Sequence, residues 1–239
     1  PVPPVVNENP TEIPTATPVI TPNKHRPDQF VMLAFDNCTE NQTWESLSRF
    51  SDEMNQKKRN AIRFTFFLSG VNFIPHNKRY SYTGPHHNPG EADIEFARSS
   101  EDIETRSQYI YKLFEEGHEL ASHAVGHFHG KDWTTSDWIE ELNFFKDVFY
   151  QNFKNLKYRK AKRMAESIAG FRAPYLDISP NLYPALKKLG YKYDTSFSRD
   201  PSRWPEQDEN GLWLYPLADV VIAGTQTHTI AMDFNFRYR

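Results

Sequence analysis

GHELASHAVGHFHG, residues 117–130, holds four of the nine histidines in a chain of 239 residues. A glycine begins it, and the run HELAS has the length and apolar content of a buried strand. Histidine is the side chain most often used for metal ligation and for proton transfer near neutral pH, so the cluster is a candidate functional site. A single histidine more often has a structural role, which is how we interpret His118, whereas His129 stays open between the two roles.

Apolar runs on both sides of this strand predict further strands. The runs lie at 29–35, 63–68, 167–171, 191–196 and 217–223. Helical spacing of apolar residues predicts three helices among them: one over 100–117, one that begins at a capping box of Asp137 and Glu140, and one over 179–190. Strands that alternate with helices indicate an α/β fold with a parallel sheet, closed or open, and helices outside it.

Composition excludes several classes of partner. The net charge is −3 with both signs interspersed, so no basic stripe is available for nucleic acid or for an anionic membrane surface. No apolar run has the length of a membrane span. The single cysteine, Cys38, excludes an intramolecular disulfide and leaves the redox compartment open. We therefore expect an uncharged or mixed-charge partner and no nucleic acid, while the oligomeric state is left open.

The sequence divides into an arm and one domain. Residues 1–27 are rich in Pro and Thr and have no periodic pattern, which is typical of an extended arm or linker. Residues 28–239 suffice for one domain with a sizeable core. Such arms often follow a removed signal peptide or lipid anchor, so we expect an exported protein, periplasmic or extracellular and associated with the cell envelope. Residues 72–100, rich in Pro, Gly, His and Asn, are interpreted as a long surface insertion.

Polar residues follow the predicted strands directly. They are Asp36 and Asn37 after the first strand, His123 and His127 after the third, Arg172 and Tyr175 after the fourth, and Asp194 within the fifth. The carboxyl ends of parallel strands meet on one face, which is where sites form in such folds. If the chain turns helical after the third strand, His123 and His127 lie on one face and can share a zinc ion, with an oxygen of Asp36 or Asn37 as third ligand.

Five motifs extend this pattern. They are LAFDN at 33–37, FTFFLSG at 64–70, GHELASHAVGH at 117–127, FRAPYL at 171–176 and GYKYDTS at 190–196. In order and approximate spacing, over about residues 29–200, the chain resembles the NodB-type polysaccharide deacetylases, the fourth carbohydrate esterase family. The resemblance implies a distorted (β/α) barrel and a hydrolase that removes an N-acetyl group from an amino sugar with a divalent metal, for which we expect zinc.

The resemblance also implies roles for single residues. In this family the first acidic residue of the first motif is the general base, the second is a metal ligand, and the H-x-x-x-H pair completes the metal site. Carried over, Asp36 is the base, His123 and His127 are ligands, and Arg172 orients the base. The backbone N–H of Tyr175 helps to hold the oxyanion.

The sequence departs from the family pattern at three places. Asn37 stands where the family usually has Asp, and because an amide oxygen is a poorer zinc ligand than a carboxylate, we expect it to be a weak third ligand. Ala124 replaces the usual Ser or Thr. No Leu-x-His motif supplies the family's late histidine, the general acid, and His228 has different surroundings. We therefore expect either that the barrel is incomplete at its C-terminus or that another group donates the proton.

Asp194 has two open roles: it orients Arg172, or it bonds neighbouring backbone amides. The expected function is N-deacetylation of a polysaccharide of N-acetylhexosamine, with peptidoglycan first and chitin or an exopolysaccharide next. One rival is a carbohydrate-binding relative with lost or weak turnover, supported by Asn37 and the missing late histidine. Another is an amidase of the same fold that acts on small cyclic amides.

Overall fold

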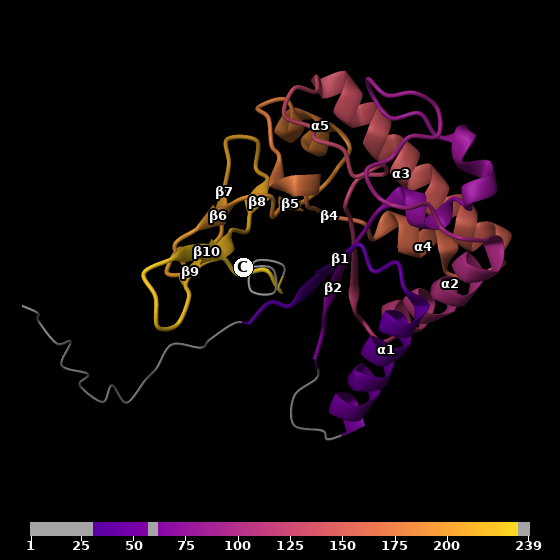
Figure 1. Cartoon of the computed structure of the whole chain (residues 1–239), viewed down its shortest axis with the longest axis horizontal. Helices are drawn as coiled ribbons and strands as arrows, with labels where there is room; N and C mark the ends of the chain where they lie inside the picture. Colours follow the sequence, from indigo (N-terminus) through magenta and orange to yellow (C-terminus); the bar gives the residue numbers. More distant parts are fainter. Residues whose placement is uncertain (1–30, 57–61, 234–239) are drawn as a thin grey trace, which may run out of the picture. The chain divides into compact units, whose positions relative to one another are not determined.

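The computed structural model describes residues 31–56 and 62–233 (Figure 1). The chain divides into two units, Pro1–Val31 and Met32–Arg239. The expected arm, residues 1–27, lies outside the described residues, and so do residues 234–239. All of the described helices and strands belong to the second unit.

The main sheet has seven strands in the order β1-β2-β3-β4-β5-β8-β7. Their bounds are β1 Ala34–Asp36, β2 Thr65–Leu68, β3 Glu119–Ser122, β4 Gly170–Phe171, β5 Tyr193–Asp194, β7 Glu206–Gln207 and β8 Trp213–Leu214. All neighbours pair in parallel except β7 with β8. The expected α/β architecture with a parallel sheet is thereby confirmed. Within the part of the chain that the structure describes, no pairing closes the sheet between β7 and β1.

Helices alternate with the strands. They are α1 Asn41–Gln56, α2 Ser100–Glu115, α3 Thr135–Asn155, α4 Ala161–Glu166 and α5 Leu182–Lys188, with short 3-10 turns η1 Gly70–Phe73, η2 His76–Ser81 and η3 Pro174–Leu176. Of these helices, α2, α3 and α5 were expected, and α1 and α4 were not. Figure 1 shows α2, α3 and α4 grouped on one side of the strands β1 to β4. No helix within 31–56 or 62–233 combines the length and apolar character needed to span a bilayer.

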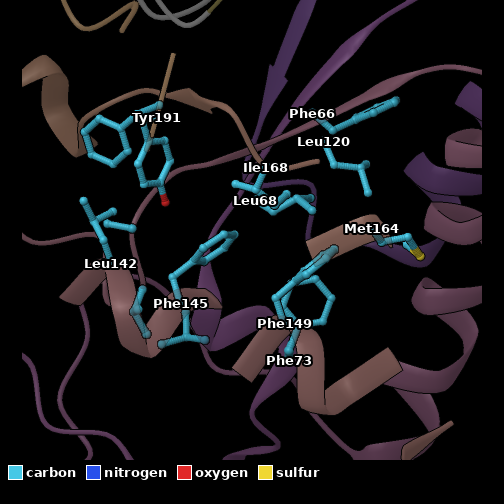
Figure 2. Close-up of a cluster of buried hydrophobic side chains, with 14 of the residues drawn as sticks. Phe66, Leu68, Phe73, Leu120, Leu142, Phe145, Phe149, Met164, Ile168 and Tyr191 are labelled. Atoms are coloured by element: carbon cyan, nitrogen blue, oxygen red, sulfur yellow. The ribbon is translucent and has the colours of Figure 1, made fainter. Parts of the chain in front are cut away.

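A large part of the core lies between α3 and the sheet. Apolar residues of α3 recur at helical spacing and are fully buried: Trp138, Leu142, Phe145, Phe149 and Phe153. Figure 2 shows Leu142, Phe145 and Phe149 of this helix in one cluster with Leu68 of β2 and Leu120 of β3. The aromatic stripe of α3 is therefore part of the hydrophobic core.

A second sheet holds the last strands. It has the order β10-β9-β6, with β6 Ser198–Arg199, β9 Leu217–Val221 and β10 His228–Ile230. The run at 217–223 thus forms a strand, but in this smaller sheet, and the sixth parallel strand of the main sheet is β8. An apolar run predicts a strand but does not predict which strand it pairs with, and this explains why the run at 217–223 was expected in the main sheet.

The helix starts differ from those expected. The Ser99 hydroxyl, rather than Ser100, accepts a hydrogen bond from the N–H of Asp102 at 3.2 Å and caps α2. The capping box of α3 joins Thr134 and Asp137, because Asp137 is itself the third helical residue. Helix α5 begins after Asn181, without a side-chain cap. Alternative caps one turn apart satisfy the same spacing rule, so the sequence does not separate them.

Candidate active site at the strand ends

Unusual backbone conformations gather at the carboxyl ends of β1, β3 and β4. Among the described residues, seven non-glycine residues have a positive φ, and five of them follow these three strands: Asn37, Ala124, His127, Tyr175 and Leu176, with φ between 50° and 60°. Left-handed backbone is disfavoured for residues with a Cβ and persists where the surroundings enforce it, commonly at functional sites. The geometry therefore marks this edge of the sheet independently of any motif.

Asp36 and Arg172 meet here from opposite parts of the chain. Nη1 of Arg172 donates to Oδ1 of Asp36 at 2.7 Å. The guanidinium is fixed on its other sides, because Nε and Nη2 donate to O and Oγ1 of Thr195 and the group lies 4.2 Å from the Phe67 ring centroid. Arg172 is almost fully buried, whereas Asp36 is partly exposed. A rigid cation thus fixes one oxygen of a carboxylate that solvent can reach.

His123 and His127 form the second part of the site. Their ring centroids are 4.9 Å apart at an interplanar angle of 69°. The expected helical turn is absent, since residues 123–130 form no helix and the left-handed Ala124 and His127 bend the chain instead. Nδ1 of His123 donates to the Arg172 carbonyl at 2.7 Å, which leaves Nε2 for another partner. The expectation that the two rings come together thus holds, but through a different backbone path.

The histidine pair fits a divalent metal. Burial lowers the pKa of His123, and burial together with the nearby His123 lowers the pKa of His127 to about 4, so both rings are neutral near pH 7, as a ligand must be. Nδ1 of His127 is buried and has no hydrogen-bond partner among the described residues. The described residues contain no group of three His, Cys, Asp or Glu side chains arranged for a metal.

The side chain of Asn37 is already engaged. Its Oδ1 accepts a short hydrogen bond from the Ser69 hydroxyl, which also contacts the carbonyl of His123 at 3.2 Å. A carbonyl oxygen has a second lone pair, so this bond leaves one acceptor position for a metal. Ser69 was not singled out in the sequence, although it lies in the FTFFLSG motif that led to this strand end.

Tyr175 occupies the exposed side of the site. Its φ and ψ are 57° and 7°, and no described residue accepts a hydrogen bond from its backbone N–H, which is therefore available. Its ring lies 4.7 Å from His127 and stacks on His129 at 3.9 Å between centroids. Nδ1 of His129 donates to Asp177 at 2.8 Å, so His129, which the sequence left open, is fixed beside the histidine pair.

Asp194 is fully buried and bonds Ser196, not Arg172. Its carboxylate accepts from the Ser196 N–H at 3.1 Å and from the Ser196 hydroxyl, which in turn accepts from the N–H of Ala173 at 2.7 Å. Of its two open roles, the described contacts match the bonding of backbone amides. Asp194 thus supports the segment that carries Arg172.

We expect Asp194→Asn to remove a pH dependence of stability. Burial raises the pKa of Asp194 from 3.8 to about 6. The native state therefore binds this proton more tightly than the unfolded chain, so the contribution is fully present below pH 3.8 and is lost as the pH rises through 6. The loss is on the order of 3 kcal/mol. Urea unfolding of both proteins from pH 4 to 7 measures it, and parallel curves would contradict the assignment.

Two other histidines lie apart from this arrangement. His118 is buried, and its Nδ1 accepts from the N–H of Phe64 at 3.0 Å while Nε2 contacts the Ser51 hydroxyl at 2.8 Å, so its contacts match the structural role expected. His228 belongs to the three-stranded sheet, is largely exposed and faces Asp219 at 3.4 Å.

Parallel strands with outer helices, and a site at the strand ends, are the architecture of the (β/α)-barrel class, although no pairing closes the sheet among the described residues. The chain belongs to the polysaccharide deacetylase family, whose sequence model matches residues 23–193, more than half of the chain. A search of curated proteins gave no match. Family membership rests on this sequence match and agrees with the resemblance drawn from the motifs.

Several solved structures are similar to this chain at low identity. An acetyl xylan esterase of family 4 from Clostridium thermocellum, in complex with cobalt, is 14% identical with a TM-score of 0.42, over 72% of this chain and 62% of that one. A peptidoglycan deacetylase variant from Bacillus subtilis is 14% identical with a TM-score of 0.39, over 65% and 54%. A CE4 family pseudoenzyme from Bacillus anthracis is 9% identical with a TM-score of 0.44, over 71% and 44%. The chain spans less than two thirds of each of these structures.

Proposed function

We propose that the protein is a metal-dependent hydrolase that removes N-acetyl groups from N-acetylhexosamine residues of a polysaccharide, with zinc as the metal. The observation that carries the proposal is the meeting of the Arg172–Asp36 pair with two neutral, neighbouring imidazoles at one edge of the sheet. Family membership supports the substrate class. The histidine pair supports the metal.

The histidines have the role of ligands. His123 and His127 would hold the metal, which when bound supplies Lewis acidity at the amide oxygen and a more acidic water. The hydrogen bond from Nδ1 of His123 to the Arg172 carbonyl fixes that ring and its tautomer. Because this carbonyl belongs to the residue that holds Asp36, one backbone unit orients both halves of the site.

Asp36 has the role of general base. Water attacks the amide carbonyl carbon, and Asp36 takes a proton from it while Arg172 holds the carboxylate in place. As the C–N bond breaks, acetate leaves with the water oxygen and the amine nitrogen needs a proton, which protonated Asp36 can return. The available backbone N–H of Tyr175 donates to the carbonyl oxygen as it gains negative charge.

Peptidoglycan is the first substrate to test, followed by chitin and exopolysaccharides. The neutral to mixed surface charge supports an uncharged or zwitterionic polymer, and the Pro-rich arm supports an exported protein of the cell envelope. The exposed Tyr175 ring beside the histidine pair supports a sugar as the bound group, because aromatic faces stack on sugar rings.

The experiment that tests this proposal measures acetate release. The full chain, loaded with zinc, is incubated with N-acetylated oligosaccharides from peptidoglycan and chitin and with a small cyclic amide, and the chelated protein serves as the control. Acetate released only by the loaded protein, and faster as the oligosaccharide lengthens, supports the proposal. Turnover of the cyclic amide alone would assign the protein to the amidases instead.

A carbohydrate-binding relative without turnover is the second candidate. It is favoured by the neutral Asn37, whose oxygen is engaged by Ser69, and by the position of His228 in the other sheet. Binding of the oligosaccharides without acetate release, by protein that retains zinc, would establish it.

Asn37→Asp should tighten metal binding by at least about tenfold. A carboxylate attracts a dication more strongly than an amide does, and the left-handed backbone at this position accepts Asp as well as Asn. Calorimetric titration of the metal-free proteins with zinc measures the change, and Asn77→Asp, at an exposed position of η2, is a matched control. Equal affinities of Asn37→Asp and the parent protein would place residue 37 outside the metal site.

A further inference from the structure

We propose that Glu141 is a positioning residue: it holds the loop that carries His123 and His127 in the conformation that makes the two rings neighbours. Glu141 lies in α3, is 1% exposed and was not indicated by any motif. The inference concerns the shape of this loop, and it rests on the proposed function only where metal binding is used as a readout.

The carboxylate of Glu141 bonds the middle of the loop directly. Its Oε1 accepts from the N–H of Val125 at 2.9 Å and from the N–H of Gly126 at 3.1 Å. These two residues lie between the histidines. A single buried oxygen thus binds two consecutive backbone amides of the bend.

The bend needs such a partner because it is conformationally costly. Ala124 has φ 58° and His127 has φ 60°, so left-handed residues lie on both sides of the bonded amides. Without helix or strand geometry, the chain cannot satisfy these N–H groups by itself, and a buried N–H without a partner is strongly disfavoured. Loss of the carboxylate would therefore favour a different path of the chain between the two histidines.

The opposite side of the loop is bonded from other segments. The carbonyls of Ala124 and Val125 accept from the N–H groups of Gly70 at 2.9 Å and Val71 at 3.2 Å. The carbonyl of Gly126 accepts from the N–H of Asp93 at 2.8 Å. These contacts fix the carbonyls, whereas the N–H groups of Val125 and Gly126 both depend on Glu141, where a single substitution can release them.

Tyr82 connects the 72–100 insertion to the same carboxylate. Its hydroxyl donates to Glu141, with distances of 2.8 and 3.0 Å to the two oxygens, and the residue is fully buried. A Cβ at Gly126 would come within 2.6 Å of this hydroxyl, so only glycine leaves room for it. The insertion is therefore not only a surface segment, because through Tyr82 it also supports the carboxylate that holds the histidine loop.

Four variants separate positioning from simple stability. Glu141→Leu removes both acceptors, and Glu141→Gln keeps one carbonyl oxygen that can still accept from Val125 and Gly126. Glu140→Gln, one residue away on an exposed position of the same helix, is the matched charge control. Phe149→Leu, in the core part of α3, lowers global stability without touching the loop.

The first measurement is hydrogen exchange of residues 122–130 in metal-free protein, and the second is the dissociation constant for zinc. We expect Glu141→Leu to accelerate hydrogen exchange in this segment at least tenfold. We also expect it to weaken zinc binding about 10- to 100-fold, the range found when residues that orient metal ligands are mutated. Glu141→Gln should give a smaller effect of the same kind. Glu140→Gln and Phe149→Leu should leave both quantities, corrected for global stability, unchanged.

The inference is overturned if amide hydrogen exchange in residues 122–130 has the parent rate in both Glu141→Gln and Glu141→Leu. It is also overturned if Phe149→Leu, at an equal loss of stability, accelerates exchange in the same residues. If the parent protein binds no zinc, the proposed metal site fails, and the exchange data decide the role of Glu141 by themselves. Should Glu141→Leu not fold, the Gln variant gives the same test.

Discussion

Asp36→Asn is expected to lower kcat by about 10²- to 10⁴-fold, the usual contribution of general acid–base catalysis, and to leave the metal content unchanged. The amide keeps the size of the carboxylate but cannot take a proton from the attacking water. Arg172 donates to Oδ1 of Asp36 at 2.7 Å, and the carbonyl of Asn would accept the same bond, so the arrangement of the site is retained.

Acetate release and metal analysis on the same preparation measure the two quantities. Asp147→Asn, on the exposed face of α3, is the control for a general effect of charge. Loss of metal in Asp36→Asn would make Asp36 a ligand, a role made more attractive by the weak donor at Asn37. Nearly normal turnover with metal retained would remove Asp36 from the mechanism.

The double variant His123→Ala, His127→Ala is expected to lose zinc and acetate release together. Each ring supplies a ligand nitrogen that no described residue replaces. The fall in metal affinity should therefore exceed the roughly 10- to 100-fold loss that follows mutation of residues hydrogen-bonded to metal ligands. Nδ1 of His127 has no partner among the described residues, whereas removal of His123 also removes its hydrogen bond to the Arg172 carbonyl, so circular dichroism of the double variant must accompany the titration. Zinc titration of the variant and of the parent protein gives the comparison.

His76→Ala provides the control, because His76 is an exposed histidine at the start of η2. It should bind zinc as the parent does. Stoichiometric zinc in the double variant would show that the metal is held elsewhere, and loss of secondary structure on removal of the rings would indicate a structural role for the pair.

The sequence predicted strands and three of the five described helices because burial has a period that can be read residue by residue, whereas α1 and α4 were not predicted. The runs at 63–68 and 118–122 lie within a residue or two of β2 and β3. The sequence could not show that residues 217–223 pair in the second sheet, because the pairing of strands depends on contacts between residues far apart in the chain. Helix caps were missed by one turn or less, where neighbouring polar residues compete for the same amides.

The candidate site was predicted in its residue types and less well in its geometry. Asp36, Arg172 and the two histidines do lie together, as expected from their places at strand ends. The bend after β3 was expected to be helical and is not, since the backbone is set by Glu141, which lies outside the motif in sequence. Thr195 and Ser69 were also missed, because a hydroxyl that bonds a neighbouring strand leaves no local pattern.

The Arg172–Asp36 pair joins residues that are 136 positions apart in the chain. During synthesis or refolding, the histidines and the first three strands can be complete while Asp36 still lacks its partner. Closing so long a loop is entropically costly and comes late unless nearer contacts form first, here the stepwise pairing of β1 through β4. We therefore expect the Arg172–Asp36 pair to form only after β4 has paired with the strands before it.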